Sequence, residues 1–289
     1  MFIASLIARP GMLDPALVEA LRNARGGGAV TWLSPDEAAE FPLEAMPDDL
    51  EGLRGSIAAQ ADLNVLPAAN RRKRMLLADM DSTMIRQECI DELADEAGVG
   101  EVVKTITARA MNGELDFEGA LTERVALLKG LPESVIAKVL AERIQLMPGG
   151  PELVATMKAA GGYAALVSGG FTAFTARVAE MVGFDENRAN SLFVADGVLT
   201  GEVGRPILGR EAKVQALEEI TARLGLSEDD VLAVGDGAND LGMLTRAGLG
   251  VALHAKPAVQ AQAQCRVNHG DLTALLFLQG YARDEFAAP

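Results

Sequence analysis

The spacing of hydrophobic and polar residues divides this chain into two parts, which meet near residue 70. In the first part, short apolar runs predict strands over residues 2–8, 29–33, 41–46 and 62–66. A helix opened by Asp14-Pro15 is predicted over 14–23, and a second helix over 50–60 after Pro47-Asp48-Asp49, since these residue types are typical of helix starts. The resulting order, βαββαβ, predicts a small α+β domain over residues 1–70.

Beyond residue 70, apolar runs alternate with helical stretches, which is typical of a parallel sheet with helices on both faces. Strands are predicted over residues 75–78, 163–167, 231–234 and 250–253, and a β-hairpin over 192–200. The helical stretch at about 88–147 is too long for a simple loop, so we expect a helical cap inserted over the carboxyl edge of the sheet. The second domain, 71–289, is therefore predicted to be α/β, with a Rossmann-like, doubly wound parallel sheet.

Composition narrows the classes of function. The 289 residues include 41 acidic and 26 basic side chains, a net charge of -15, which argues against binding to nucleic acid or to an anionic membrane. The basic run at 71–74 is interpreted as a linker or strand flank. Two cysteines and two histidines provide neither a zinc site nor a disulfide framework. Because no apolar run approaches the ~18 residues of a membrane span, we expect a globular cytoplasmic protein.

Polar residues follow three of the predicted strands of the second domain. They are Asp79, Asp81 and Thr83 after the first strand, Ser168-Gly169-Gly170 after the second, and the run Gly235 to Asp240 after the third. Ligands of open parallel sheets bind beyond the carboxyl ends of the strands, so we expect these clusters to meet at one site. Side chains two residues apart in an extended chain point the same way, so Asp79 and Asp81 can both face this site. A divalent cation or a shared proton would then offset the repulsion between the two carboxylates. A hydroxyl with glycine amides ahead of a helix is suited to phosphate.

Other interpretations of these motifs fail at specific positions. A calcium-binding EF-hand loop starting at Asp79 would need a glycine and a glutamate at positions that are methionine and isoleucine here. A dinucleotide-binding fingerprint starting at Gly235 would need a third glycine where Asp240 stands. Leu166 replaces the first glycine of a hydrolase nucleophile elbow around Ser168. A metal site combined with a phosphate site remains.

Together the motifs resemble those of the haloacid dehalogenase-type phosphatases. The resemblance rests, in this order, on Asp79-x-Asp81-x-Thr83, Ser168 at a strand end, the isolated Lys213 and the run Gly235 to Asp240. Glu88, Arg124 and the run Val167 to Thr172 extend it, over roughly residues 75–280, to the members that act on phosphoserine. The N-terminal βαββαβ unit is similar to the ACT-like domain that some bacterial members carry.

The resemblance implies a reaction and a role for each residue. The reaction is hydrolysis of O-phosphoserine to serine and phosphate, the last step of serine biosynthesis, with Mg²⁺ as cofactor. Asp79 would be the nucleophile that forms an aspartyl-phosphate, and Asp81 the general acid and base. The other implied roles are metal binding by Asp79, Asp236 and the backbone carbonyl of Asp81, phosphoryl binding by Ser168, Gly169, Lys213 and Asn239, support by Thr83 and Asp240, and substrate ammonium and carboxylate binding by Glu88 and Arg124.

Alternatives remain open at this point. The substrate could be another small phosphorylated alcohol, such as phosphothreonine, or a homoserine acceptor could receive the phosphoryl group. The chain could instead act mainly as an amino-acid sensor through residues 1–70, for which a structural or dimerising role, giving a homodimer, is the competing interpretation. Met111 and Phe117 are expected either to form an apolar wall of the substrate site or to pack in the core.

Overall fold

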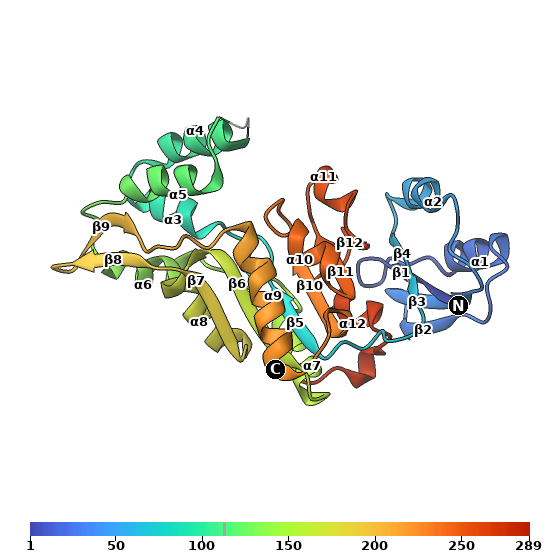
Figure 1. Cartoon of the computed structure of the whole chain (residues 1–289). Coiled ribbons are helices and arrows are strands. Elements are labelled where there is room, and N and C mark those ends of the chain that lie inside the picture. The colour runs from blue at the N-terminus through green and yellow to red at the C-terminus, as the bar shows by residue number, and fades with distance from the viewer. Residues whose placement is uncertain (112–113) are drawn as a thin grey trace.

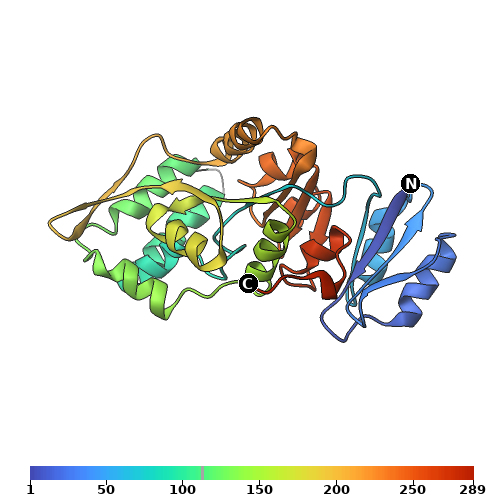
Figure 2. The same ribbon diagram turned by 90° about the horizontal axis from the view of Figure 1, so that it is seen from below.

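The computed structural model describes residues 1–111 and 114–289. Within these residues, the strands form a four-stranded sheet, a six-stranded sheet and a two-stranded ribbon (Figure 1). Seen from below, the N-terminal sheet lies at one end of the molecule, the larger sheet in the middle, and a group of helices with the ribbon at the other end (Figure 2). No helix in this described part combines the length and the apolar composition needed to cross a membrane.

The N-terminal sheet confirms the predicted βαββαβ order. Its elements are β1 (Phe2–Ile7), α1 (Pro15–Ala24), β2 (Thr31–Ser34), β3 (Ala38–Leu43), α2 (Leu50–Ile57) and β4 (Asp62–Pro67). The strand order is β2-β3-β1-β4, and neighbouring strands are antiparallel. The strand predicted at 41–46 begins earlier, at Ala38, and ends at Leu43. Asp36, in the left-handed region at φ 51°, forms a tight turn between β2 and β3. Strand β3 therefore begins soon after β2, at an earlier residue than predicted.

The six-stranded sheet confirms the predicted parallel α/β architecture. Its order is β12-β11-β10-β5-β6-β7, and each neighbouring pair is parallel. The strands are β5 (Met75–Ala78), β6 (Tyr163–Phe171), β7 (Glu186–Asn190), β10 (Val231–Gly235), β11 (Leu249–Leu253) and β12 (Cys265–Val267). The sequence pattern does not reveal the edge strands, because β7 is largely polar and β12 has only three residues. Strand β6 also continues to Phe171, beyond the predicted end at residue 167, so the Ser168-Gly169-Gly170 segment belongs to the strand.

Helices cover both faces of this sheet. Helices α7 (Gly150–Ala159) and α8 (Thr172–Val182) pack on one face, and α9 (Arg210–Leu224) and α10 (Leu241–Arg246) on the other. In β5, Leu76 and Ala78 join the hydrophobic cluster of α7 and α8, whereas Met75 and Leu77 join that of α9 and α10. Burial on both sides explains why this strand is a continuous apolar run. The chain is completed by α11 (Pro257–Gln260), α12 (Ala274–Leu278) and 3-10 turns at Glu228–Asp230 and Arg283–Glu285.

A group of helices is inserted between β5 and β6. They are α3 (Cys89–Glu96), α4 (Gly100–Met111), α5 (Phe117–Ala126) and α6 (Ser134–Glu142). Ile90, Leu93 and Ala94 are buried on one face of α3, as the helical spacing predicts. The ribbon of β8 (Leu192–Ala195) and β9 (Val198–Val203) confirms the predicted hairpin and packs against α5 (Figure 1). These elements bring a second set of side chains close to the strand ends.

Candidate active site

The carboxyl ends of β5, β6 and β10 meet the inserted helices around a cavity of about 360 Å³. The residues that the sequence singles out and that line this cavity are Asp79, Asp81, Glu88, Arg124, Ser168, Gly169, Asp236 and Asn239. The other predicted residues, Thr83, Lys213 and Asp240, are buried and contact the carboxylates of the cavity or one another. The fold therefore brings the whole predicted set together from segments far apart in the sequence.

Lys213 lies between two carboxylates. It comes from the first turn of α9, and its side chain is 1% exposed. Its Nζ is 2.6 Å from Oδ1 of Asp79 and 2.6 Å from Oδ1 of Asp240. Burial by itself lowers the pKa of Lys213, but Asp240 and Asp79 together outweigh burial and raise that pKa. Lys213 therefore remains a cation, and it contacts the proposed nucleophile directly.

Three carboxylates surround a position suited to a metal ion. Oxygens of Asp79, Asp236 and Asp240 lie within 4.8 Å of one another. The Thr83 hydroxyl donates a hydrogen bond to Oδ1 of Asp236 (3.2 Å), and the Gly237 amide donates to Oδ2 of Asp240 (2.9 Å). Burial, and then the charge of Asp240, raise the pKa of Asp79, and the same causes raise the pKa of Asp236 to about 6. Because the ammonium of one lysine does not neutralise this group, a hard divalent cation such as Mg²⁺ fits its oxygens.

The structure adds one candidate metal ligand to those expected from the sequence. Asp240, expected to support the metal site, presents its own carboxylate to the cluster. The side chain of Asp81 points elsewhere, since Oδ1 accepts a hydrogen bond from the Cys89 amide (2.8 Å) and Oδ2 from the Ser168 hydroxyl (3.2 Å). Burial raises the pKa of Asp81, so this carboxyl takes up a proton more readily than an exposed aspartate does. That property suits a general acid.

Gly170, for which the sequence predicts no individual role, lets Asp81 and Ser168 approach each other. Its amide donates a hydrogen bond to Oγ of Ser168 (2.8 Å). A Cβ at this position would lie 2.6 Å from Oδ2 of Asp81 and 3.1 Å from Oγ of Ser168. A side chain here would therefore displace the carboxylate. Gly169 and Gly170 both line the cavity, but the amide of Gly170 already donates to Ser168.

Glu88 and Arg124 place opposite charges in the same cavity. Glu88 precedes α3, and its Oε1 accepts a hydrogen bond from the Ser82 hydroxyl (2.7 Å). Burial first, and the charge of Asp81 second, raise the pKa of Glu88 to about 7. Arg124 lies in the last turn of α5, where burial lowers its pKa and acidic neighbours oppose this effect. A ligand that carries both an ammonium and a carboxylate would meet complementary charges here.

Some residues that line the cavity are not predicted from the sequence. Thr107 comes from α4, and its buried hydroxyl has no hydrogen-bond partner among the residues that the structure describes. Lys256 follows β11, the neighbour of β10, so its place at a strand end is the signal that could have identified it. Phe117, for which the sequence left open a place in the cavity wall or in the core, does line the cavity, and its ring would lie 3.0 Å from a Cβ on Gly169. The side chain of Met111 lies outside the described residues.

Comparison with known proteins shows the family to which the chain belongs. The haloacid dehalogenase-like hydrolase family matches residues 76–245, and the chain therefore belongs to this family, as its motifs predict. Within the family, it is similar to phosphoserine phosphatases. It is 42% identical over 261 residues to that of Streptomyces coelicolor, which covers 88% of this chain and 63% of that protein. It is 47% identical to that of Archaeoglobus fulgidus, over 71% of this chain and 60% of that protein.

The chain thus spans about three fifths of the length of these two relatives, with 63% and 60% covered. A shorter relative, the phosphoserine phosphatase of Streptococcus thermophilus, is 48% identical over 69% of this chain and 93% of its own length. This shorter match shows that most of that enzyme's length has a counterpart here.

Solved structures extend the likeness to the N-terminal sheet. A haloacid dehalogenase family hydrolase from Salmonella enterica serovar Typhi superposes with a TM-score of 0.87 and 31% identity, over 98% of this chain and 99% of that chain. A probable phosphoserine phosphatase from Vibrio cholerae has a TM-score of 0.79 and 34% identity, over 98% and 87% of the two chains. A substrate-bound phosphoserine phosphatase has a TM-score of 0.66 and 42% identity, over 71% of this chain and 97% of that chain.

Proposed function

We propose that this protein hydrolyses O-phosphoserine to serine and phosphate, as the last step of serine biosynthesis, with Mg²⁺ as cofactor. The observation that carries the proposal is the cavity that holds the carboxylates Asp79 and Asp81 together with the charged pair Glu88 and Arg124. The carboxylates suit phosphoryl transfer, and the charged pair suits an amino acid. The similarity to several phosphoserine phosphatases supports the same assignment.

In the proposed mechanism, a carboxylate oxygen of Asp79 attacks phosphorus and forms an aspartyl-phosphate while the bond from phosphorus to the serine oxygen breaks. Asp81 gives its proton to that leaving oxygen. Asp81 then takes a proton from the water that attacks the aspartyl-phosphate, which releases phosphate and restores both side chains. Lys213 stabilises the ionised form of Asp79. The groups placed to hold the phosphoryl oxygens are Ser168, Gly169 and Asn239.

The metal would be held by side-chain oxygens of Asp79, Asp236 and Asp240 together with the backbone carbonyl of Asp81. Bound Mg²⁺ supplies positive charge that offsets the repulsion between these carboxylates and the phosphoryl group. Chelation of divalent cations is therefore expected to abolish phosphate release, and readdition of Mg²⁺ to restore it.

Phosphate release from a panel of phosphomonoesters tests the proposal. The protein with Mg²⁺ is expected to favour O-phospho-L-serine over phosphothreonine and glycerol phosphate. Glu88→Gln and Arg124→Lys are expected to raise KM for phosphoserine and to change the rate on glycerol phosphate little. Glu92→Gln is the matched control, because Glu92 pairs with Arg143 (3.0 Å) and does not line the cavity. Equal efficiency on all esters, or phosphoryl transfer to homoserine in preference to water, would reject the phosphoserine assignment.

We also propose the domain division predicted from the sequence: an ACT-like domain over residues 1–70 and a phosphatase domain over 71–289, with its cap at about 88–147. The N-terminal sheet supports this division because it encloses its own hydrophobic cluster, which includes Leu6, Val18, Phe41 and Val65. A homodimer through this domain and a cytoplasmic location belong to the same proposal. Light scattering of the full chain tests the dimer, and a monomer mass would contradict it.

A further inference from the structure

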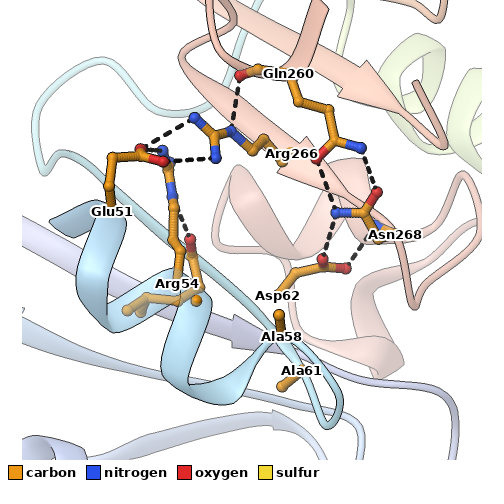
Figure 3. Close-up of a pocket in the computed structure, with 10 residues that line it drawn as sticks. Glu51, Arg54, Ala58, Ala61, Asp62, Gln260, Arg266 and Asn268 are labelled. Atoms are coloured by element: carbon orange, nitrogen blue, oxygen red, sulfur yellow. Dashed lines mark hydrogen bonds and ion pairs between the residues drawn. The ribbon is translucent and has the colours of Figure 1, made fainter. Parts of the chain in front are cut away.

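The N-terminal sheet and the six-stranded sheet meet at their edge strands, β4 and β12. Hydrogen bonds from side chains to the backbone join the two strands here, in place of backbone-to-backbone hydrogen bonds. Nδ2 of Asn64 on β4 donates to the Arg266 carbonyl on β12 (2.9 Å), and Oδ1 of Asn64 accepts from the Arg266 amide (2.8 Å). The carboxylate of Asp62 accepts from the amides of Asn268 and His269 (2.8 Å each). Beside this junction lies a cavity of about 220 Å³, between α2 and the segment that ends in β12 (Figure 3).

Two arginines, one from each side, line this cavity and are held in place by backbone carbonyls. Arg54, on α2, donates from Nε to the Leu63 carbonyl (3.0 Å) and from Nη2 to the Gln264 carbonyl (3.1 Å). Arg266, on β12, donates from Nε to the Gln260 carbonyl (2.7 Å). Their side chains are only 11% and 17% exposed. The guanidinium groups are thus positioned by contacts that do not involve a carboxylate.

The remaining donors of both arginines converge on the carboxylate of Glu51. Oε1 of Glu51 is 2.7 Å from Nη1 of Arg54 and 3.0 Å from Nη2 of Arg266, and Oε2 is 2.8 Å from Nη1 of Arg266 (Figure 3). The Glu51 side chain is 67% exposed, in contrast to the arginines. The Glu51 carboxylate can return to water because it is mostly exposed. The two arginines, by contrast, would stay largely shielded from water, where an unpaired charge is costly, so another anion has to replace Glu51.

We propose that this cavity is a second binding site, which takes a small organic carboxylate in place of the Glu51 side chain. The paired guanidinium donors match the two oxygens of a carboxylate, as the present contacts of Glu51 show. The cavity has room for roughly seven water molecules at ~30 Å³ each, and therefore for an organic acid of similar size. Asp62 and Asn268, at the other end of the cavity, offer polar contacts for the rest of the ligand (Figure 3).

A short helix connects this cavity to the active site. Gln260, the last residue of α11, lines the second cavity, and Lys256, the residue before α11, lines the active-site cavity. Nε2 of Gln260 donates to the Ala255 carbonyl (2.7 Å) and to Oδ1 of Asn268 (2.8 Å). As part of the same proposal, a shift of Arg266 or Gln260 on ligand binding would displace α11 and, with it, Lys256. We expect occupancy to change KM for the phosphorylated substrate more than kcat.

Isothermal titration of the full chain with 4-aminobutanoate, whose carboxylate suits the arginines and whose ammonium suits Asp62, tests the binding site. Because Glu51 acts as a tethered competitor, Glu51→Ala is expected to bind 4-aminobutanoate about tenfold more tightly than the unaltered chain. Arg266→Lys, which keeps the charge but loses the fork of donors, is expected to weaken binding. Glu19→Ala is the matched control, since Glu19 forms a comparable exposed pair with Arg22 on α1, outside the cavity, and should leave binding unchanged.

An unchanged affinity for 4-aminobutanoate in Glu51→Ala would overturn the proposal, and this comparison stands even if Arg266→Lys fails to fold. A second titration with inorganic phosphate separates carboxylate recognition from general anion binding. An equal gain for phosphate in Glu51→Ala would overturn the carboxylate assignment. Neither titration depends on catalysis, so failure here is distinct from failure of the phosphatase assignment. KM measured with and without 4-aminobutanoate then tests the link through α11. A KM that this ligand leaves unchanged in both the unaltered chain and Glu51→Ala would overturn that link.

Discussion

Replacing Lys213 with methionine tests whether its charge holds the carboxylates of the active site together. Methionine keeps much of the volume but removes the ammonium, which lies 2.6 Å from both Asp79 and Asp240 and is 1% exposed. Removing one partner of a buried ion pair costs about 3–5 kcal/mol, because the remaining charge stays buried without compensation. We expect Lys213→Met to lower the free energy of unfolding by about this amount in the absence of divalent cations.

The loss should depend on pH in a defined direction. Burial and Asp240 already raise the pKa of Asp79 in the presence of Lys213, and removal of the ammonium raises that pKa further. A carboxyl whose pKa is higher in the folded state than in the unfolded state stabilises the fold while protonated. Its contribution is lost as the pH rises above the unfolded pKa of about 4. The loss caused by Lys213→Met should therefore be smaller at pH 5 than at pH 8, and Mg²⁺ should recover part of it.

Urea unfolding of the full chain, with and without Mg²⁺, measures this effect. Lys158→Met is the matched control, because Lys158 pairs with Asp185 at 2.7 Å but is 38% exposed. An exposed pair contributes about 0–1 kcal/mol, so this control should lose little. If Lys213→Met lost no more stability than Lys158→Met, or if its loss were the same at both pH values, the electrostatic role assigned to Lys213 would be wrong.

Three further predictions concern the active-site cavity. Gly170→Ala should lower kcat by about ten- to a hundredfold in steady-state assays, because its Cβ would lie 2.6 Å from Oδ2 of Asp81, and unchanged kcat would contradict the assigned position of Asp81. The Glu88 carboxyl, with a pKa of about 7, becomes the anion that an ammonium needs as the pH rises, so KM for phosphoserine should fall between pH 6 and 8. Glu88→Gln should remove this part of the pH dependence, and an identical KM profile would refute the role. Thr107→Val should leave thermal stability unchanged or slightly higher, because the buried Thr107 hydroxyl has no partner among the described residues. A raised KM for phosphoserine in this variant would identify the Thr107 hydroxyl as a substrate contact.

The parts of the fold that follow from local pattern could be predicted closely from the sequence. Strand β5 spans the predicted residues Met75–Ala78, because four apolar side chains buried on both faces end at a polar turn. Asp79, Ser168 and Asp236 could be predicted to meet, because parallel strands place their carboxyl ends at one edge. Their motifs also carried the family resemblance, which the family match confirms.

Features that depend on tertiary packing could not be predicted. Strand β12 has three residues, too few for a periodic pattern, and it is held by pairing with β11 and by contacts to β4. The pair of Glu51 with Arg266 joins positions 215 residues apart, and nothing local to either residue indicates it. Whether Lys213 is buried or exposed likewise depends on the sheet against which α9 packs, since lysines near a helix start are common on surfaces.

Trapping of the covalent intermediate tests the central claim most directly. The full chain with Mg²⁺ would be mixed with O-phospho-L-serine labelled with ³²P, quenched in acid after a short time, and examined for label bound to protein. We expect label on the unaltered chain that hydroxylamine removes, as for an acyl phosphate, and no label on Asp79→Asn, whose amide is a poor nucleophile. Release of phosphate without bound label, or equal labelling and turnover in Asp79→Asn, would contradict the account.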